Sequence, residues 1–460
     1  MRDIYLVNYS VKGVKTLDNL VSLSFYKKTI TKSPETQDYN IKGIYGMNGS
    51  GKSGIVTSVA ILKNILTDSG YLNNPITQKN LDAIINKKTG VLYIEADYIA
   101  KLKKQTYLFK YCIELSKDES GKYIISHECL STKKATSKSN SMEILFESLN
   151  GEFITVYGME KKAELAVELF NKTLNLLSTV SVGALFSDKF LIKNIIEKYR
   201  KEKSVLFLCI GLLYSFGTKL QVYMDQSDYH SDYFSQNSLE SNQNYIKYSI
   251  RRNTLAGVFM GMENLYLDVI SITNNIVPKK KYEYFEKSIE KLCDFIKIFK
   301  SDLKEIEIEK KENGDFYICE LIMVYEAYKI NAEFESTGIK KLIKLFAYLK
   351  EMVNGGIVFI DEFDSNLHDV YLCALLEYLM EYGDGQLCFT THNVGPMDIL
   401  KQNKKSIDFL SEDHKIYPWK TNGNYSPSKL YRNGMIEGSP FNVDSIDFIG
   451  IFSTDDPGCG

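Results

Sequence analysis

The spacing of apolar residues predicts two strand-rich segments at the start of the chain. Residues 1 to about 65 contain three strand-like runs, IYLVNYS, LVSLSFY and IKGIYG, and then change to the helical pattern SGIVTSVAILKNIL. From Val91 to about Glu147, four further strand-like runs are separated by clusters of Lys, Gly, Ser and Asp. We therefore expect a strand, loop and helix unit followed by an antiparallel β extension.

The middle of the chain changes to helical spacing, between about Met159 and Phe299. One series with steps of three and four is Phe285, Ile289, Leu292, Phe295, Phe299 and Leu303. The apolar run from Val205 to Phe216 is shorter than the ~20 residues that a membrane-spanning helix needs, so it predicts a buried helix. The polar run from Asp225 to Asn244 predicts a surface loop, either a lid or an excursion without a role. We expect an inserted helical lobe.

Strand and helix patterns alternate again near the end of the chain. The runs IEIEKK and FYICELIMVYE flank Asn313-Gly314, a pair typical of a hairpin turn. The elements expected next are a helix from Thr337, a strand over Gly356 to Ile360, a helix over Val370 to Tyr382 and a strand over Gln386 to Thr390. This order predicts the second half of an α/β core.

Composition and charge narrow the class of protein. The chain has 460 residues, 44% of them hydrophobic, so we expect two or three packed units. Its formal net charge is −2, so we expect contact with nucleic acid only at local basic clusters. The eight cysteines form no CxxC pair, which predicts reduced thiols. No basic and apolar leader opens the sequence. We therefore expect a cytoplasmic protein without a membrane partner.

The strongest chemical signal is the phosphate loop, Gly46 to Ser53 (GMNGSGKS), a full match to GxxxxGK[ST] between a strand and a helix. The glycines allow backbone N–H groups to face phosphates at a helix N-terminus, Lys52 reaches the β- and γ-phosphates, and the Ser53 hydroxyl binds Mg²⁺. The residues expected to bind ATP here are Asn48, Gly49, Ser50, Gly51, Lys52 and Ser53.

A second signal is the apolar strand GIVFI, which ends in Asp361 and Glu362. A continuous apolar run suits a buried parallel strand beside the phosphate loop. We expect Asp361 to hold Mg²⁺, directly or through water, and Glu362 to orient and activate the attacking water. Because many strands end in acidic residues, the Asp-Glu pair indicates ATP chemistry only in combination with the phosphate loop.

Three further segments resemble motifs of ABC-type ATPases. Glu335-Ser336-Thr337-Gly338 opens a helix 25 residues before Asp361 and resembles the Ser-x-Gly signature. The segment from Asp364 to His368 resembles the D-loop, and His392, which follows a short strand, resembles the switch histidine. Each segment alone has an ordinary structural explanation, but their order along the chain favours the functional one.

Together these motifs make the chain similar to the ABC-type AAA ATPases of the OLD, RecF and SMC class, and most of all to OLD-like ATPases of bacterial anti-phage systems. The resemblance covers residues 1 to about 65 and about 303 to 400. It implies slow ATP hydrolysis in a head-to-tail dimer or a larger homo-oligomer. In such a dimer, ATP and Mg²⁺ lie between the phosphate loop of one chain and Ser336 and Gly338 of the other, with Asp364 at the interface and His392 on the γ-phosphate.

The resemblance divides the chain into four parts within an α/β fold. Residues 1–90 are expected to form the N-terminal part of the ATPase head, 91–150 an antiparallel β segment, 151–302 a helical insertion, and 303–460 the C-terminal part of the head. The insertion is the segment expected to contact a partner, because the ATP chemistry does not need it.

Two departures from the family shape the functional prediction. The chain shows no clear Q-loop glutamine, for which Gln78 and Gln105 are candidates, and 68 residues follow His392 (460 − 392), too few for a Toprim nuclease domain. We therefore expect an ATPase without nuclease activity that acts as sensor or scaffold for a separately encoded effector, a nuclease or toxin.

Two alternatives stay open. One is a RecF- or SMC-like DNA-binding ATPase of repair or chromosome maintenance, in which basic clusters at Lys101–Lys104 and Lys279–Lys281 contact phosphates. Because the chain has no heptad array of coiled-coil length, the SMC type is disfavoured. The other is a binding module that uses ATP only to hold an assembly together, against which Glu362 argues.

Overall fold

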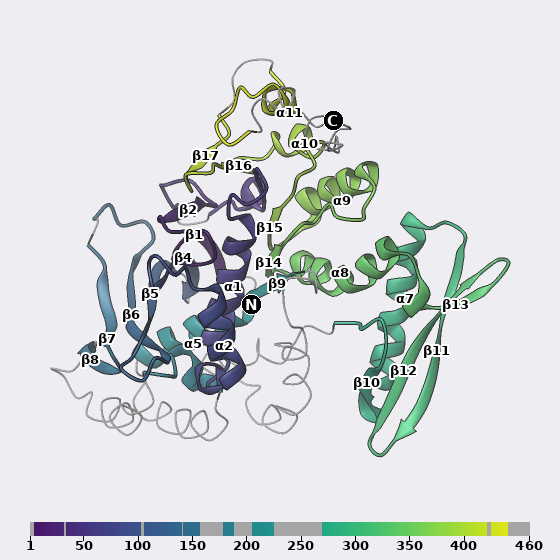
Figure 1. The fold of residues 1–460 in the computed structure, drawn as a ribbon, viewed down its shortest axis with the longest axis horizontal. Helices are drawn as coiled ribbons and strands as arrows, with labels where there is room; N and C mark the ends of the chain where they lie inside the picture. Colours follow the sequence, from purple (N-terminus) through teal and green to yellow (C-terminus); the bar gives the residue numbers. More distant parts are fainter. Residues whose placement is uncertain are drawn as a thin grey trace, which may run out of the picture.

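The computed structural model describes residues 4–31, 34–102, 105–139, 141–156, 178–187, 205–224, 269–420 and 425–439. They form an antiparallel sheet, a mostly parallel sheet and a smaller lobe with its own sheet (Figure 1). In the view of Figure 1 the antiparallel sheet lies on the left and the lobe on the right, with the parallel sheet between them. The expected mixed α/β fold is confirmed.

The antiparallel sheet has seven strands in the order β2-β1-β4-β5-β6-β7-β8. Its strands are β1 (Ile4–Lys12), β2 (Val21–Ser24), β4 (Leu92–Leu102), β5 (Gln105–Lys117), β6 (Tyr123–Lys134), β7 (Glu143–Leu149) and β8 (Glu152–Val156). Buried and less buried residues alternate along β5, as expected for a sheet with one face on the core. The sheet therefore includes the β extension expected from Val91 and also the first two strands of the chain.

The second sheet has six strands in the order β17-β16-β3-β15-β14-β9. Its strands are β3 (Ile41–Gly46), β9 (Leu220–Tyr223), β14 (Ile357–Ile360), β15 (Gln386–Thr390), β16 (Ile407–Leu410) and β17 (Ile416–Pro418). All neighbours pair in parallel except β17, which pairs antiparallel with β16. The carboxyl ends of the parallel strands therefore meet at one edge, where ligands bind in open α/β sheets.

Helices cover both faces of the parallel sheet. The helices of this part are α1 (Lys52–Thr67), α2 (Pro75–Ile84), α5 (Val205–Lys219), α8 (Thr337–Val353), α9 (Asp369–Tyr382), α10 (Met397–Leu400) and α11 (Pro427–Arg432). One core joins α1 and α5 to the antiparallel sheet, and Tyr9 Oη lies 2.7 Å from Ser58 Oγ there. A second core holds α8 to α11 on the other face. Strand β3 has buried residues in both cores and α1 has them in the first, so the two elements that flank the phosphate loop are fixed by packing.

The smaller lobe consists of β10 (Asn275–Pro278), α7 (Tyr282–Phe299), β11 (Leu303–Asn313), β12 (Phe316–Tyr325) and β13 (Lys329–Asn331). The predicted hairpin is confirmed, but its two-residue turn is Gly314-Asp315, one residue later than expected, because Asn313 still pairs with Phe316. Three residues of α8, Ile339, Leu342 and Ile343, belong to the core of this lobe. Helix α8 therefore joins the lobe to the parallel sheet.

Short 3₁₀ helices complete the described chain. They are η1 (Gln37–Tyr39), η2 (Tyr71–Asn73), η4 (Gly183–Ser187), η8 (Lys279–Lys281) and η9 (Ala332–Phe334). Of these, η9 leads directly into the Ser-x-Gly segment at the start of α8.

The expectation of one helical insertion over 151–302 is wrong for part of that range. Strand β9 pairs with β14, and α5 packs against α1, so residues 205–223 belong to the part of the molecule built on the parallel sheet. Helix α7 ends at Phe299, and Leu303 begins β11. Short apolar runs do not distinguish a strand from a helix, which explains the error. The helical pattern over 164–177 and the polar run 225–244 lie outside the described residues.

Helix α5 is strongly apolar, and most of its residues are buried. None of the helices in the described ranges combines the length and the hydropathy that crossing a membrane requires.

Candidate active site

The phosphate loop connects β3 to α1 at the edge where the parallel strands end. Gly49 and Gly51 have φ angles of +80° and +103°, which side chains other than glycine rarely adopt. A Cβ atom at Gly51 would lie 2.4 Å from Leu17 Cδ2, whereas no described atom lies within 4 Å of a Cβ at Gly49. The loop is therefore packed on one side and open on the other, and the first N–H groups of α1 face the open side as an anion site.

Lys52 is buried in this loop and bends back onto it. Its Nζ donates to Gly46 O at 2.7 Å and to Met47 O at 2.9 Å. Burial lowers the Lys52 pKa to about 8, although the carboxylates of Asp361 and Glu362 oppose the shift. A bound phosphate would raise the Lys52 pKa again, because an anion nearby favours the protonated form.

Thr390 connects the two acids of β14 to the neighbouring strand β15. Its Oγ1 donates to Asp361 Oδ1 at 2.5 Å and accepts from Glu362 N at 2.8 Å. Phe363 N donates to Thr390 O at 3.0 Å. Glu362 has a φ angle of +47°, unusual for a residue with a side chain, and these bonds hold it there. Thr390 therefore orients both acids.

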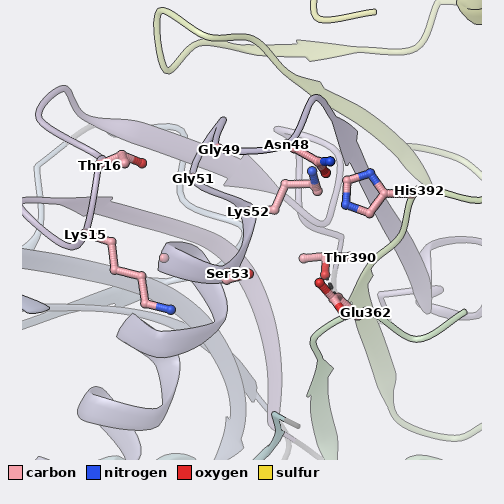
Figure 2. Close-up of a pocket in the computed structure, with 11 residues that line it drawn as sticks. Lys15, Thr16, Asn48, Gly49, Gly51, Lys52, Ser53, Glu362, Thr390 and His392 are labelled. Atoms are coloured by element: carbon pink, nitrogen blue, oxygen red, sulfur yellow. Dashed lines mark hydrogen bonds between the residues drawn. The ribbon is translucent and has the colours of Figure 1, made fainter. Parts of the chain in front are cut away.

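The phosphate loop, the acidic end of β14 and the end of β15 enclose one cavity (Figure 2). The residues that line it are Lys15, Thr16, Asn48, Gly49, Gly51, Lys52, Ser53, Gly54, Glu362, Thr390 and His392. Seven of these were predicted from the sequence as site residues, from three distant segments. Lys15 and Thr16, from the loop between β1 and β2, lie across the phosphate loop from Glu362 and His392 (Figure 2).

His392 lies at the rim of this cavity, beyond the end of β15. Partial burial and the nearby Lys52 ammonium lower its pKa, which keeps the imidazole neutral near pH 7. The following residue is fixed, because Asn393 N donates to Thr391 Oγ1 and Asn393 Nδ2 donates to Asp369 Oδ1, both at 2.9 Å. A neutral imidazole in this place can donate a hydrogen bond to a phosphate oxygen.

The donor groups of the cavity fit ATP with Mg²⁺. The Ser53 hydroxyl and the buried Asp361 carboxylate supply oxygen ligands, and no cluster of three or more His, Cys, Asp or Glu in the described chain forms a metal site by itself. Mg²⁺ commonly takes one or two protein oxygens together with phosphate oxygens and water. Ser50 Oγ is buried without a hydrogen-bond partner among the described residues, so it is available to a phosphate.

Five predicted site residues are absent from the cavity lining: the buried Ser50 and Asp361, and Ser336, Gly338 and Asp364. Ser336 is exposed at the start of α8, where its Oγ accepts from Ile339 N at 3.4 Å. Gly338 packs so closely that a Cβ there would lie 2.8 Å from Asn366 O. Asp364 follows Glu362 by two residues, and its charge acts on the Lys52 pKa.

Neither glutamine considered for the Q-loop reaches this cavity. Gln78 exchanges hydrogen bonds with the backbone of Tyr123, and Gln105 accepts from Tyr107 Oη at the start of β5. The carboxyl end of β9, by contrast, lies directly beside that of β14. The chain leaves β9 toward residues 225–268, which lie outside the described residues.

Replacing Thr390 with Val removes the hydroxyl and keeps the side-chain shape. We expect ATP hydrolysis to fall roughly 10- to 100-fold, because Asp361 and Glu362 lose their common hydrogen-bond partner. The free energy of unfolding should fall by about 1–3 kcal/mol, since the buried Asp361 carboxylate loses a donor. Steady-state hydrolysis and denaturant unfolding measure both effects. Thr132→Val is the matched control for hydrolysis, because Thr132 is a buried threonine of β6 whose Oγ1 donates to Leu108 O at 3.1 Å, and equal rates in the two variants would contradict the assignment.

Comparison with known proteins supports an ATPase. No family model matches the chain. Over 438 residues the chain is 23% identical to the Retron Vc95 probable ATPase of Vibrio cholerae serotype O1 biovar El Tor, with 89% of this chain and 77% of that protein covered. The solved structure of the recombination mediator protein RecF-ATPrS of the RecFOR pathway is similar at 12% identity, over 91% of this chain and 99% of that chain. Its TM-score of 0.37 is too low to carry an argument about function.

The comparison with the Vibrio cholerae protein, which is named a probable ATPase, supports the resemblance to ATPases that the motifs indicated. The cavity indicates which residues of this chain would bind the nucleotide.

Proposed function

We propose that this chain hydrolyses ATP as the sensor or scaffold of a bacterial anti-phage system and controls a separately encoded effector, a nuclease or toxin. The observation that carries the proposal is the convergence of Lys52, Ser53, Glu362 and His392 on one cavity. The Vibrio cholerae relative is named as a retron ATPase, which supports a place for this chain in an element of that kind.

The residues of the cavity divide the chemistry among them. The phosphate loop binds the triphosphate through backbone N–H groups and Lys52, and Ser53 and Asp361 would hold Mg²⁺. Bound Mg²⁺ neutralises charge on the β- and γ-phosphates. Glu362 accepts a proton from the water that attacks the γ-phosphorus, and ADP leaves as the bond to the β-phosphate oxygen breaks. His392 donates to a γ-phosphate oxygen.

The second half of the proposal is a head-to-tail dimer. Ser336 begins α8 on an exposed face, away from the chain's own phosphate loop cavity. A helix N-terminus with an exposed Ser hydroxyl suits the γ-phosphate of a nucleotide that another copy holds. The dimer therefore places two ATP molecules between the two chains, and larger homo-oligomers build on it.

Replacing Ser336 with Arg tests this arrangement. The larger cationic side chain should block the approach of the second head, so ATP-dependent dimerisation should be lost while ATP binding by the monomer stays within about threefold. Light scattering with and without ATP and Mg²⁺ measures the mass. Ser120→Arg, in the exposed turn between β5 and β6, is the matched control. A Ser336→Arg protein that still doubles its mass would contradict the signature assignment.

The system-level proposal is tested in cells challenged with phage. The chain and the product of its adjacent gene should protect together, and Lys52→Ala should remove protection. Full protection by this chain alone, or nuclease activity of the purified chain, would contradict a separate effector.

Salt-dependent DNA binding that strengthens with ATP would instead support the RecF-like alternative. In the structure, Lys279 pairs with Glu312 at 3.2 Å, which reduces the charge of that basic cluster.

A further inference from the structure

Two cysteines face each other on neighbouring strands of the antiparallel sheet. Cys112 of β5 and Cys129 of β6 are direct partners in the strand register. The sequence neighbours Tyr111 and Ile113 are buried in the core that the sheet shares with α1. Because side chains alternate between the two faces of a strand, the two cysteines lie on the other face, and both are half-buried there.

The register brings the two cysteines close enough for a covalent bond. Directly opposed residues of an antiparallel pair have Cα atoms about 4.5–5.5 Å apart and side chains on the same face. A disulfide spans Cα distances of about 4.4–6.8 Å, so rotation of the two side chains can form one with little movement of the strands. Cys319 and Cys388, which also lie in described strands, have other residues as their register partners.

The surroundings of the pair keep both sulfurs protonated at neutral pH. Cys112 Sγ donates to Glu95 Oε2 at 3.6 Å, and Tyr93 Oη lies 3.7 Å from the same sulfur. Burial raises the pKa of Cys112 to about 12 and the pKa of Cys129 to about 11, and the carboxylates of Glu95 and Glu147 act in the same direction. Since the thiolate is the form that reacts with oxidants, the pair reacts slowly near pH 7 and faster as the pH rises.

The other charged groups near the pair do not reverse this effect. The Lys110 ammonium lowers the pKa of both thiols, but it also pairs with Glu95 at 2.8 Å. On the same face of β6, His127 Nε2 lies 3.1 Å from Glu147 Oε1. Glu128, buried on the opposite face, raises the pKa of Cys129 further. The thiol form is therefore the resting state of the pair.

We propose that Cys112 and Cys129 are a modification site at which hydrogen peroxide forms a reversible disulfide within the chain. One thiolate attacks a peroxide oxygen, the O–O bond breaks, and a sulfenic acid and water result. The second thiolate attacks the sulfenic sulfur, the S–S bond forms, and the second water leaves. Two thiols thus lose two electrons and two protons while the peroxide is reduced to two waters, and a dithiol reverses the reaction.

The disulfide joins β5 to β6 within the sheet that packs on α1. A bond between the two strands restricts the unfolded chain, so oxidation should raise the midpoint of thermal unfolding. This site goes beyond the ATP chemistry and does not depend on the proposed function.

The test exposes the full-length protein to excess hydrogen peroxide, blocks the remaining thiols with N-ethylmaleimide and maps the peptides by mass spectrometry. In the wild type, the peptides that contain Cys112 and Cys129 should be joined by a bond that dithiothreitol breaks, in a chain that stays monomeric on a non-reducing gel. Because both thiols ionise well above pH 8, joining should be roughly tenfold faster at pH 8 than at pH 7.

Matched variants identify the bond. Cys112→Ser should give no joined peptides and no rise of the unfolding midpoint on oxidation, and Cys129→Ser serves the same purpose if Cys112→Ser does not fold. Cys373→Ser, at a half-buried cysteine of α9, is the control and should behave as the wild type. Recovery of Cys112 and Cys129 only as N-ethylmaleimide adducts or sulfinic acids would overturn the proposal, as would a bond from either of them to another cysteine.

Discussion

Replacing Glu362 with Gln is expected to lower ATP hydrolysis by roughly 10²- to 10⁴-fold while ATP binding persists. Gln keeps the size of the side chain but cannot accept the proton of the attacking water. The backbone of Glu362 is fixed by Thr390 Oγ1 at 2.8 Å and by Lys341, and neither contact involves the carboxylate that is changed. The loop should therefore keep its conformation, and the ATP-bound state should accumulate.

The mass of the Glu362→Gln protein in solution then shows whether the ATP-bound state is a dimer. With ATP and Mg²⁺ the Glu362→Gln protein should double its mass and remain doubled, whereas the wild type should return to monomer as ATP is consumed. Glu377→Gln, at an exposed position of α9, is the matched control and should behave as the wild type. Hydrolysis at the wild-type rate by Glu362→Gln would show that another group activates the water.

The elements that carry the chemistry could be predicted because their patterns are local. The phosphate loop begins directly after β3 and leads into α1, and the apolar strand β14 ends at the predicted Asp361 and Glu362. In each case the residues that bind and the element that positions them are neighbours in the sequence. Burial and backbone geometry then follow from a short stretch of chain.

Strand β9 could not be predicted, because a distant partner decides its conformation. Its four residues, Leu220–Tyr223, follow an apolar helix and pair in parallel with Ile357–Ile360 far along the chain. That pairing corrects the domain division. Gln78 and Gln105, the glutamines considered for the Q-loop, form hydrogen bonds with residues of the antiparallel sheet.

Contacts between distant segments explain why the sequence did not predict Lys15, Thr390 and Lys341 as residues of the site. Lys15 reaches the cavity from the first loop of the chain, and no spacing in the sequence relates it to the phosphate loop. Thr390 ends β15 directly after three apolar residues, which was a usable signal for a polar role at the sheet edge. Lys341 stands in the amphipathic run IKKLIKL, where a lysine is normally exposed. Only the packing of α8 against the loop after β14 buries it.

Replacing Lys52 with Ala is expected to weaken ATP binding by roughly 100-fold or more. The ammonium supplies charged hydrogen bonds to the phosphates, and each such bond is worth about 1.5–3 kcal/mol. The free protein should not be destabilised by the change. Burial lowers the Lys52 pKa from 10.5 to about 8, so below pH 8 the folded protein holds a charge that the unfolded chain would solvate better. That penalty disappears as the pH rises through 8 toward 10.5, and Ala removes it at every pH.

Thermal unfolding separates loss of binding from loss of folding. Without nucleotide, Lys52→Ala and the wild type should unfold at similar temperatures near pH 7. Adding ATP and Mg²⁺ should raise the midpoint of the wild type and of Lys79→Ala, an exposed lysine of α2, but not that of Lys52→Ala. An equal rise in all three proteins would mean that ATP binds without the Lys52 ammonium. The phosphate site would then have to be assigned to another cation, and Lys15 is the other lysine among the described residues that line the cavity.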